Sequence, residues 1–288
     1  MNSNEDIVNN IINAINVIFD NLFTSIDSTL YKNLDNLIFI DSSILNDNFF
    51  YKIFGTSASN GILLISNSLL FGILIYYSIK IMMSNFTSSR IESPTHFIFK
   101  MIIFGICMNC SFFIIEQILN INSNICLAIR SIGEDIFKHE INFSNLIESM
   151  GLSITETKDI FSMDGLIKGT FTTSLVSLVF SYAIRYIMLK IFVLITPFAF
   201  LSLMTQNTEW FFKSWCKNIF SLLFIQIVVD LILLILFSMN IENNNLLYKL
   251  IYIGGIYALI RANSIAREFA GGISTSVQSN LNMLKMIK

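Results

Sequence analysis

Residues 170–204, TFTTSLVSLVFSYAIRYIMLKIFVLITPFAFLSLM, form a nearly unbroken apolar run. A polar joint, TQNTEWFFKSWCKN, follows at 205–218, and a second apolar run, IFSLLFIQIVVDLILLILFSM, occupies 219–239. A transmembrane helix needs about 20 apolar residues, so both runs are long enough to cross a bilayer. This stretch predicts a polytopic membrane protein, and we expect its core here.

Charged and helix-breaking residues interrupt these runs. Arg185 and Lys190 lie in the first run, Pro197 follows them, and Asp230 lies near the middle of the second run. Charges at membrane depth are costly and usually face protein or a water-filled cavity. Beyond Lys190 only about 14 apolar residues remain, too few for a full span, and a proline removes a helical hydrogen bond. We therefore expect a re-entrant or kinked segment around Pro197, which would act as a hinge.

The composition places the whole chain in the membrane class. Of its 288 residues, 54% are hydrophobic and 13% are charged, whereas about a quarter are charged in soluble proteins. The apolar runs are too long and too uniform for a β-barrel. The sequence thus predicts an all-α bundle of transmembrane helices, and it lacks the broad basic surface typical of nucleic-acid binding.

Hydrophobic periodicity divides the chain into about five spans and flanking segments. Apolar residues at three- and four-residue spacing predict a peripheral amphipathic helix over 4–27, packed on lipid or on protein. The expected spans are 61–83, 97–119, from 171 to about 190, 219–239 and 246–262. The divisions are an N-terminal extracytoplasmic segment at 1–56, a transmembrane hairpin at 57–119, an acidic extracytoplasmic segment at 120–169, a transmembrane core at 170–262 and a cytoplasmic tail at 263–288. Within the acidic segment, isoleucines at helical spacing occupy positions 121, 125, 129, 132 and 136.

Basic residues near the span ends predict the orientation. With five spans, one side holds residues 80–100, 185–218 and the tail with Arg261, which carry eleven basic residues and three acidic ones. The other side holds sixteen of the twenty acidic residues. We therefore expect a cell-membrane protein with its N-terminus outside and its C-terminus in the cytoplasm.

Motifs for catalysis or nucleotide binding are missing from the sequence. It contains no G-x-x-x-x-G-K-[ST] loop, no H-E-x-x-H and no G-x-S-x-G. His96 and His139 fall on opposite expected sides of the membrane. Cys107 and Cys110 form a C-x-x-C in an apolar run without a nearby histidine, which favours small residues of a membrane helix over a zinc half-site. We expect no enzymatic activity, no cofactor and no metal.

Polar residues within the core spans are the candidate site. Arg185 and Asp230 are expected at similar depth, either as a buried ion pair that clamps two helices or as part of a polar conduit. Three further residues, Ser177, Ser181 and Gln226, share the helix faces of this pair. Near the joint, Trp210 and Trp215 are expected to anchor a helix at the membrane interface or to contact a partner helix.

The run from Lys190 to Leu233, KIFVLITPFAFLSLMTQNTEWFFKSWCKNIFSLLFIQIVVDLIL, resembles the core of the VirB6/TrbL family of conjugative type IV secretion subunits, especially those on mobile elements of Gram-positive bacteria. The matching features are the T-P-F within an apolar run, the F-F-K-S-W joint and the glutamine-containing span after it. The family's tryptophan near the cytoplasmic side corresponds to Trp215. The resemblance implies a polytopic subunit of a DNA- or protein-transfer complex, forming part of a membrane conduit or scaffold. It also implies an oligomeric assembly with separate ATPases and other secretion subunits, surrounded by membrane lipid and in transient contact with a nucleoprotein substrate.

Two other functions remain open from the residues alone. A stand-alone transporter of ions or small molecules predicts a substrate site at an unwound helix, for which the break at Pro197 is a candidate. A permease subunit of an export system with a separate ATPase predicts a short cytoplasmic coupling helix, for which residues 205–218 are a candidate.

Overall fold

The computed structural model describes residues 10–18, 30–55, 60–87, 93–146, 163–239 and 246–270. All regular structure in these ranges is helical, with no strand, which confirms the all-α class. Four helices are long and apolar enough to cross a membrane: Gly61–Ser84, Ser111–Phe137, Gly169–Ser202 and Glu209–Phe237. Two shorter apolar helices cover Pro94–Asn109 and Leu250–Ala266. This arrangement is consistent with a membrane protein.

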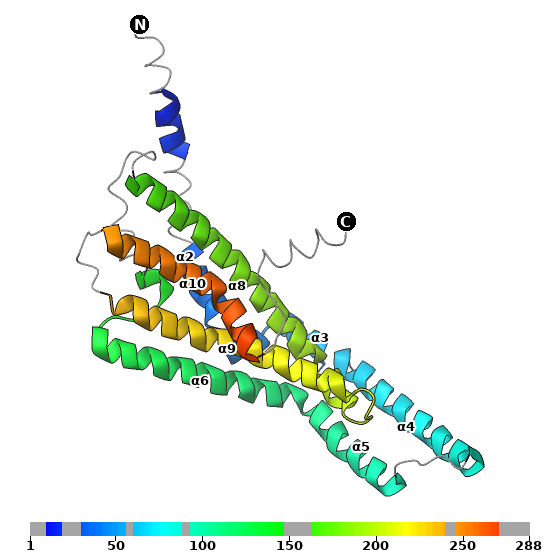
Figure 1. Cartoon of the computed structure of the whole chain (residues 1–288). Helices are drawn as coiled ribbons and strands as arrows, with labels where there is room; N and C mark the ends of the chain where they lie inside the picture. The colour runs from blue at the N-terminus through cyan, green and yellow to red at the C-terminus, as the bar shows by residue number, and fades with distance from the viewer. Residues whose placement is uncertain are drawn as a thin grey trace.

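The helices form an elongated bundle (Figure 1). In chain order they are α2 Leu30–Ile38, η1 Ser42–Leu45, α3 Asn48–Phe54, α4 Gly61–Thr87, α5 Pro94–Asn109, α6 Ser111–Phe137, α8 Met163–Ser202, α9 Glu209–Phe237 and α10 Leu246–Ala270. Helix α9 is central, because α6, α8 and α10 all pack against it. Helices α4 and α5 form a hairpin at one end of the bundle and contact α8.

The second expected span, 97–119, is divided in the structure. Helix α5 ends at Asn109, and Cys110 (φ −87°, ψ 6°) joins it to α6. Helix α6 then continues to Phe137, through residues that the sequence placed in an acidic segment outside the membrane. The isoleucines at helical spacing face outward: Ile121, Ile125, Ile132 and Ile136 are exposed, whereas Asn122 and Cys126 on a neighbouring face are buried. In a bilayer, lipid takes the place of an apolar core and favours this outward orientation.

Helix α8 runs without interruption through Pro197, so the re-entrant alternative is wrong, while the kink and hinge expected at Pro197 stay predictions. Pro197 has no N–H to donate to the carbonyl of Val193. Neighbouring side chains add hydrogen bonds one residue earlier, where the Phe192 carbonyl accepts from Thr196 Oγ1 at 3.0 Å and from Trp215 Nε1 at 3.0 Å. Packing on α9 therefore stabilises the helix where its own hydrogen-bond ladder is weakened. The turn to α9 is short, and α9 already begins at Glu209, inside the expected polar joint.

The N-terminal segment contributes to the interior of the bundle, while its expected location outside the membrane stays a prediction. Residues of α2, η1 and α3 belong to the main hydrophobic core; buried there are Leu34, Ile38, Ile40, Ile44, Leu45, Phe50 and Phe54. Helix α2 packs on α8, and η1 packs on α6. Of the expected amphipathic helix over 4–27, only residues 10–18 lie in the described part; they are helical, and Ile11, Val17 and Ile18 are exposed.

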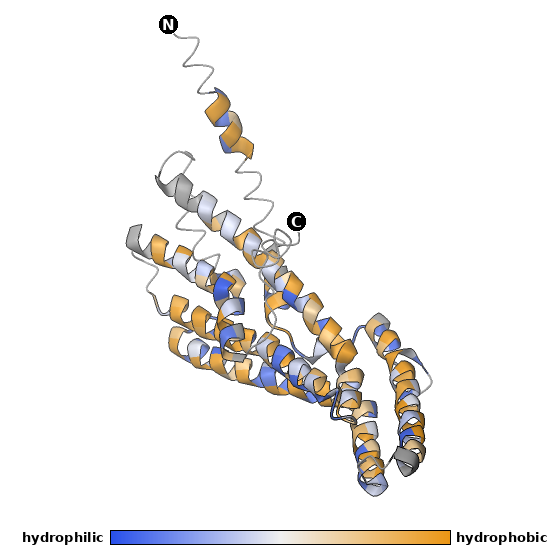
Figure 2. Cartoon of the chain, turned by 45° about the vertical axis from the view of Figure 1, so that its right-hand side comes forward, coloured by the Kyte–Doolittle hydropathy of each residue, from blue (hydrophilic) through white to orange (hydrophobic). Residues whose placement is uncertain are grey.

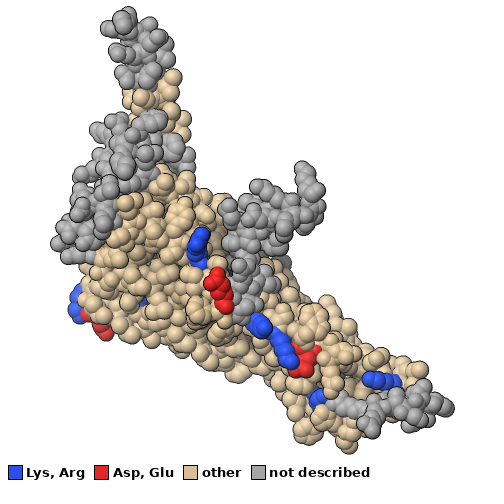
Figure 3. Space-filling model, in the orientation of Figure 1, with Lys and Arg blue, Asp and Glu red and all other residues tan. Residues whose placement is uncertain are grey.

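The outer surface is mostly apolar. Large exposed hydrophobic side chains occur on every long helix, including Phe71 on α4, Phe99 on α5 and Phe220 on α9. Figure 2 shows hydrophobic residues, in orange, along the length of the helices. Charged side chains are sparse on the face drawn in Figure 3: most lie in a narrow band from its middle to its right, and a few lie at its left edge. Soluble monomers rarely expose continuous apolar surfaces of this extent, so lipid or other subunits must cover it.

Candidate functional site

The polar residues of the bundle meet in a buried cluster between α2, α6, α8 and α9. Arg185 of α8 is fully buried. Its Nε donates to the Leu222 carbonyl of α9 at 2.9 Å, and its Nη1 donates to the Ile38 carbonyl at the end of α2 at 2.9 Å. One guanidinium therefore connects three elements, and its planar shape matches acceptors in several directions.

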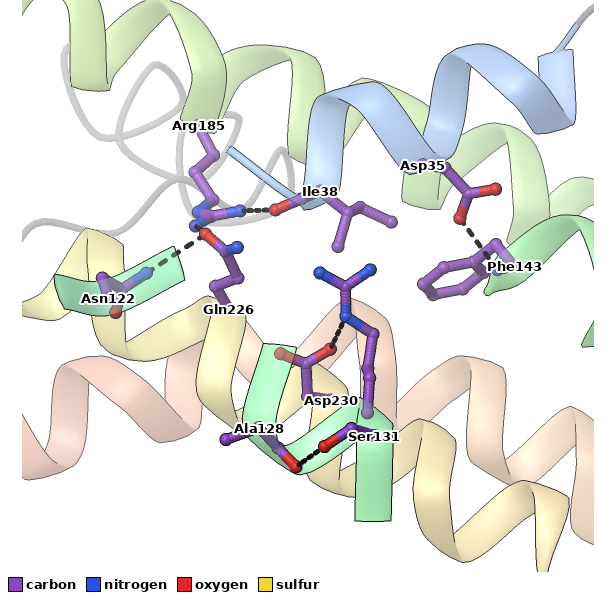
Figure 4. A network of polar contacts seen from close by, with 10 residues as sticks. Asp35, Ile38, Asn122, Ala128, Ser131, Phe143, Arg185, Gln226 and Asp230 are labelled. Atoms are coloured by element: carbon purple, nitrogen blue, oxygen red, sulfur yellow. Dashed lines mark hydrogen bonds and ion pairs between the residues drawn. The ribbon is translucent and has the colours of Figure 1, made fainter. Parts of the chain in front are cut away.

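Gln226 of α9 extends this cluster toward α6. Its Oε1 accepts from Arg185 Nη2 at 3.5 Å and from Asn122 Nδ2 at 3.2 Å (Figure 4). Both amide side chains are buried. The sequence identified Gln226 as a candidate, but Asn122 was not singled out. We refer to Asn122, Arg130, Arg185, Gln226 and Asp230 together as the polar cluster.

The expected pairing of Arg185 with Asp230 is wrong, because no hydrogen bond or ion pair joins these two residues. The carboxylate of Asp230 instead faces α6, with its Oδ1 3.6 Å from Nε of Arg130. Asp230 is fully buried, and neither of its oxygens accepts a hydrogen bond; Arg130 Nε also lacks an acceptor. Both arginines lie near the face of α9 that carries Gln226 and Asp230. The guanidinium of Arg185, however, donates its hydrogen bonds to two backbone carbonyls and to Gln226.

Arg130, like Asn122, is a residue of the polar cluster that the sequence analysis did not single out. It was assigned to the acidic segment, because the apolar run ended at Leu119. Its guanidinium carbon lies 4.1 Å from the centre of the Phe39 ring of the N-terminal segment. The signal was a second face of α6, beside the isoleucines, where Asn122, Cys126 and Arg130 follow at four-residue intervals.

A second polar contact joins α8 to α10. Asn263 Nδ2 donates to Ser181 Oγ at 2.6 Å, and the Tyr182 hydroxyl donates to the Leu259 carbonyl at 3.1 Å. Ser181 is thus a helix contact separate from the polar cluster. Ser177 is exposed and belongs to neither group.

The two tryptophans occupy different environments. Trp215 is buried, bonded to the Phe192 carbonyl and stacked on Phe212 with ring centroids 5.5 Å apart. Trp210 is 66% exposed. An interface role was predicted for both tryptophans, but only Trp210 has an exposed side chain. Trp215 and Pro197 lie where α8 packs against α9.

The cluster can bind and orient charge, but its chemistry does not suggest covalent catalysis. Within the described residues, no three His, Cys, Asp or Glu side chains gather to hold a metal. Cys107 and Cys110 are unpaired thiols at the α5–α6 joint. The fold and the cluster define a helical bundle of membrane-protein type with charged groups at its centre. Comparison of the chain with protein-family models, curated proteins and solved structures found no match.

Proposed function

We propose that the chain is an integral membrane subunit of a conjugative type IV secretion complex, where it forms part of the membrane conduit or scaffold. The observation that carries this proposal is the contrast between its interior and its outer surface. Polar residues of the described core bond to one another and to backbone carbonyls, whereas large apolar side chains are exposed on all the long helices. Such a chain is suited to work among other subunits.

The stretch that resembles this family also forms the centre of the bundle. It covers the C-terminal part of α8, the turn and most of α9. Its tryptophan, Trp215, bonds to the α8 backbone next to the T-P-F sequence. The features that carry the resemblance are thus adjacent in space. Their adjacency supports a resemblance in the architecture of the core.

The expected partners follow from the same proposal. Separate ATPases would supply energy, because the chain has no phosphate-binding loop. Lipid and neighbouring subunits, including further copies of the chain, would cover the exposed apolar surface. A nucleoprotein substrate would contact the assembled complex transiently, with the N-terminus outside the cell and the C-terminus in the cytoplasm.

No structural observation favours the two alternatives. A transporter with its site at Pro197 would need an unwound helix there, and α8 is continuous. A permease would need a separate coupling helix within 205–218, and residues 209–218 are the first turns of α9.

Affinity purification from native membranes in mild detergent tests the proposal. A C-terminally tagged chain should recover a secretion-type ATPase, a DNA-coupling ATPase and a relaxase, whereas an unrelated tagged polytopic protein should recover none of them. Trp210→Ala should weaken this recovery if Trp210 contacts a partner, with Phe220→Ala as the matched exposed control on α9. Recovery of the chain alone, or with a single transporter-type ATPase, would overturn the proposal.

A further inference from the structure

We propose that residues 30–54, comprising α2, η1 and α3, form a removable cap that closes a polar groove between α6, α8 and α9. In the structure described here the cap is closed. When the cap moves away, water reaches the polar cluster. This inference goes beyond the proposed function and does not depend on which complex contains the chain.

The position of α2 supports a cap. Figure 4 shows Ile38 of α2 between Arg185 on one side and Asp35 on the other, with Gln226 and Asp230 of α9 on the opposite side of the cluster. Ile38 is fully buried, and the ring of Phe39 lies against the guanidinium of Arg130. Two cap residues therefore contact both arginines of the cluster.

The cap is fastened to the bundle by a few polar contacts in addition to its apolar packing. Asp35 accepts from Phe143 N at 2.8 Å, from Ser144 N at 3.3 Å and from Ser144 Oγ at 2.8 Å. At the other end, Asp47 forms an ion pair with Lys190 of α8 at 3.7 Å. Together with the bond from Arg185 to the Ile38 carbonyl, these contacts hold the cap at three points.

The groups beneath the cap are incompletely bonded when it is closed. Both carboxylate oxygens of Asp230 and Nε of Arg130 are buried without a hydrogen bond. Buried polar atoms normally have partners, and each exception needs an explanation. Water entering an opened groove would satisfy all three atoms. The closed state therefore contains a local penalty that opening removes, as expected for an element with two states.

The chemistry of the opened groove follows from its lining. Arg130 and Arg185 contribute two positive charges and Asp230 one negative charge, beside the amides of Gln226 and Asn122. Charged residues in membrane segments usually face the protein interior or a water-filled cavity. The groove thus favours water and small hydrated anions over cations or apolar ligands.

Cys126 provides a native reporter for this movement. It is fully buried on α6, and its side chain lies beside the Asp230 carboxylate. A chain that keeps only this thiol is obtained with Cys107→Ser, Cys110→Ser and Cys216→Ala. Membrane vesicles are treated with a charged maleimide, and modification of Cys126 is measured by peptide mass spectrometry.

Loss of the Asp35 hydrogen bonds tests the cap. Asp35→Ala removes three hydrogen bonds and should raise the rate of Cys126 modification about tenfold or more, because the open population grows by the corresponding factor. Asp41→Ala is the matched control: Asp41 bonds within its own segment, to Ser43 N at 2.9 Å, and is exposed. It should leave the rate unchanged.

A reversible lock separates cap opening from misfolding. Asp35→Cys with Ser144→Cys places two thiols where the native side chains meet, and disulfide formation requires such proximity. In the oxidised protein, Cys126 should be protected from the maleimide. Reduction should raise the rate of Cys126 modification about tenfold, because the reduced variant lacks the hydrogen bonds of Asp35. Equal rates before and after reduction would overturn the proposal even if Asp35→Ala fails to fold. Equal rates in folded Asp35→Ala and Asp41→Ala would also overturn it.

Discussion

Oδ1 of Asp230 lies 3.6 Å from Nε of Arg130, and this contact joins the centre of α9 to α6. Asp230 lies in α9, the most hydrophobic helix. Arg130 lies beyond the end of the apolar run that was predicted as the second span. Their contact also directs one face of α6 toward the interior, so that the isoleucines of that helix point outward. The partner of Asp230 thus determines how α6 is oriented in the bundle.

Removing either member of this pair should destabilise the fold. Asp230→Leu or Arg130→Met alone should lower the free energy of unfolding by about 3 kcal/mol, because one buried charge loses its partner. The double variant should regain most of this loss. Reversible SDS unfolding in mixed micelles measures the change. Arg185→Met with Asp230→Leu is the control pair, and recovery there would instead support the pairing of Arg185 with Asp230.

Lysine should not replace Arg185. A lysine keeps the charge but cannot direct donors toward Leu222, Ile38 and Gln226 in one plane. Arg185→Lys should therefore cost about 2–4 kcal/mol of unfolding free energy, corresponding to two or three lost bonds. Lys213→Arg is the matched control on the surface, where its partner Glu209 is exposed, and it should stay within about 0.5 kcal/mol. Equal stability of the two variants would contradict the role of Arg185 as a clamp.

The two tryptophans should differ in their effect on stability. Trp215→Phe keeps the aromatic packing and removes the bond to the Phe192 carbonyl, so it should cost about 1–2 kcal/mol. Trp210→Phe should change stability by less than about 0.5 kcal/mol, because Trp210 is exposed. Thermal unfolding of the detergent-solubilised protein compares them. A larger loss for Trp210→Phe would show that the two environments are assigned the wrong way round.

Adjacent glycines in α10 offer a matched test of packing. A Cβ at Gly255 would overlap the buried side chain of Leu236 on α9, whereas a Cβ at Gly254 would meet no atom within 4 Å. Gly255→Ala should destabilise the bundle by about 1–3 kcal/mol through overpacking. Gly254→Ala should be neutral or stabilise by up to about 1 kcal/mol, because alanine favours helix. The same unfolding assay applies, and equal losses would argue against close α9–α10 packing.

The sequence by itself determined the helical class and most of the span positions. Long apolar runs must form helices in a bilayer, where backbone groups can bond only internally. The first expected span, 61–83, lies wholly within α4, and the fourth, 219–239, lies within α9 except for its last two residues. Arg185, Gln226 and Asp230 were recognised as interior residues for a related reason, because polar groups at this depth avoid lipid.

Tertiary structure decided the contacts among these residues. Arg185 bonds to backbone carbonyls, and backbone carbonyls carry no sequence signal. Asp230 pairs with a residue 100 positions earlier, and the burial of residues 30–54 depends on the space left between α6 and α8. Pro197 remains within a helix because side chains of two helices add bonds there. Local sequence determines where helices form, but the choice among nearby polar partners depends on how the helices pack.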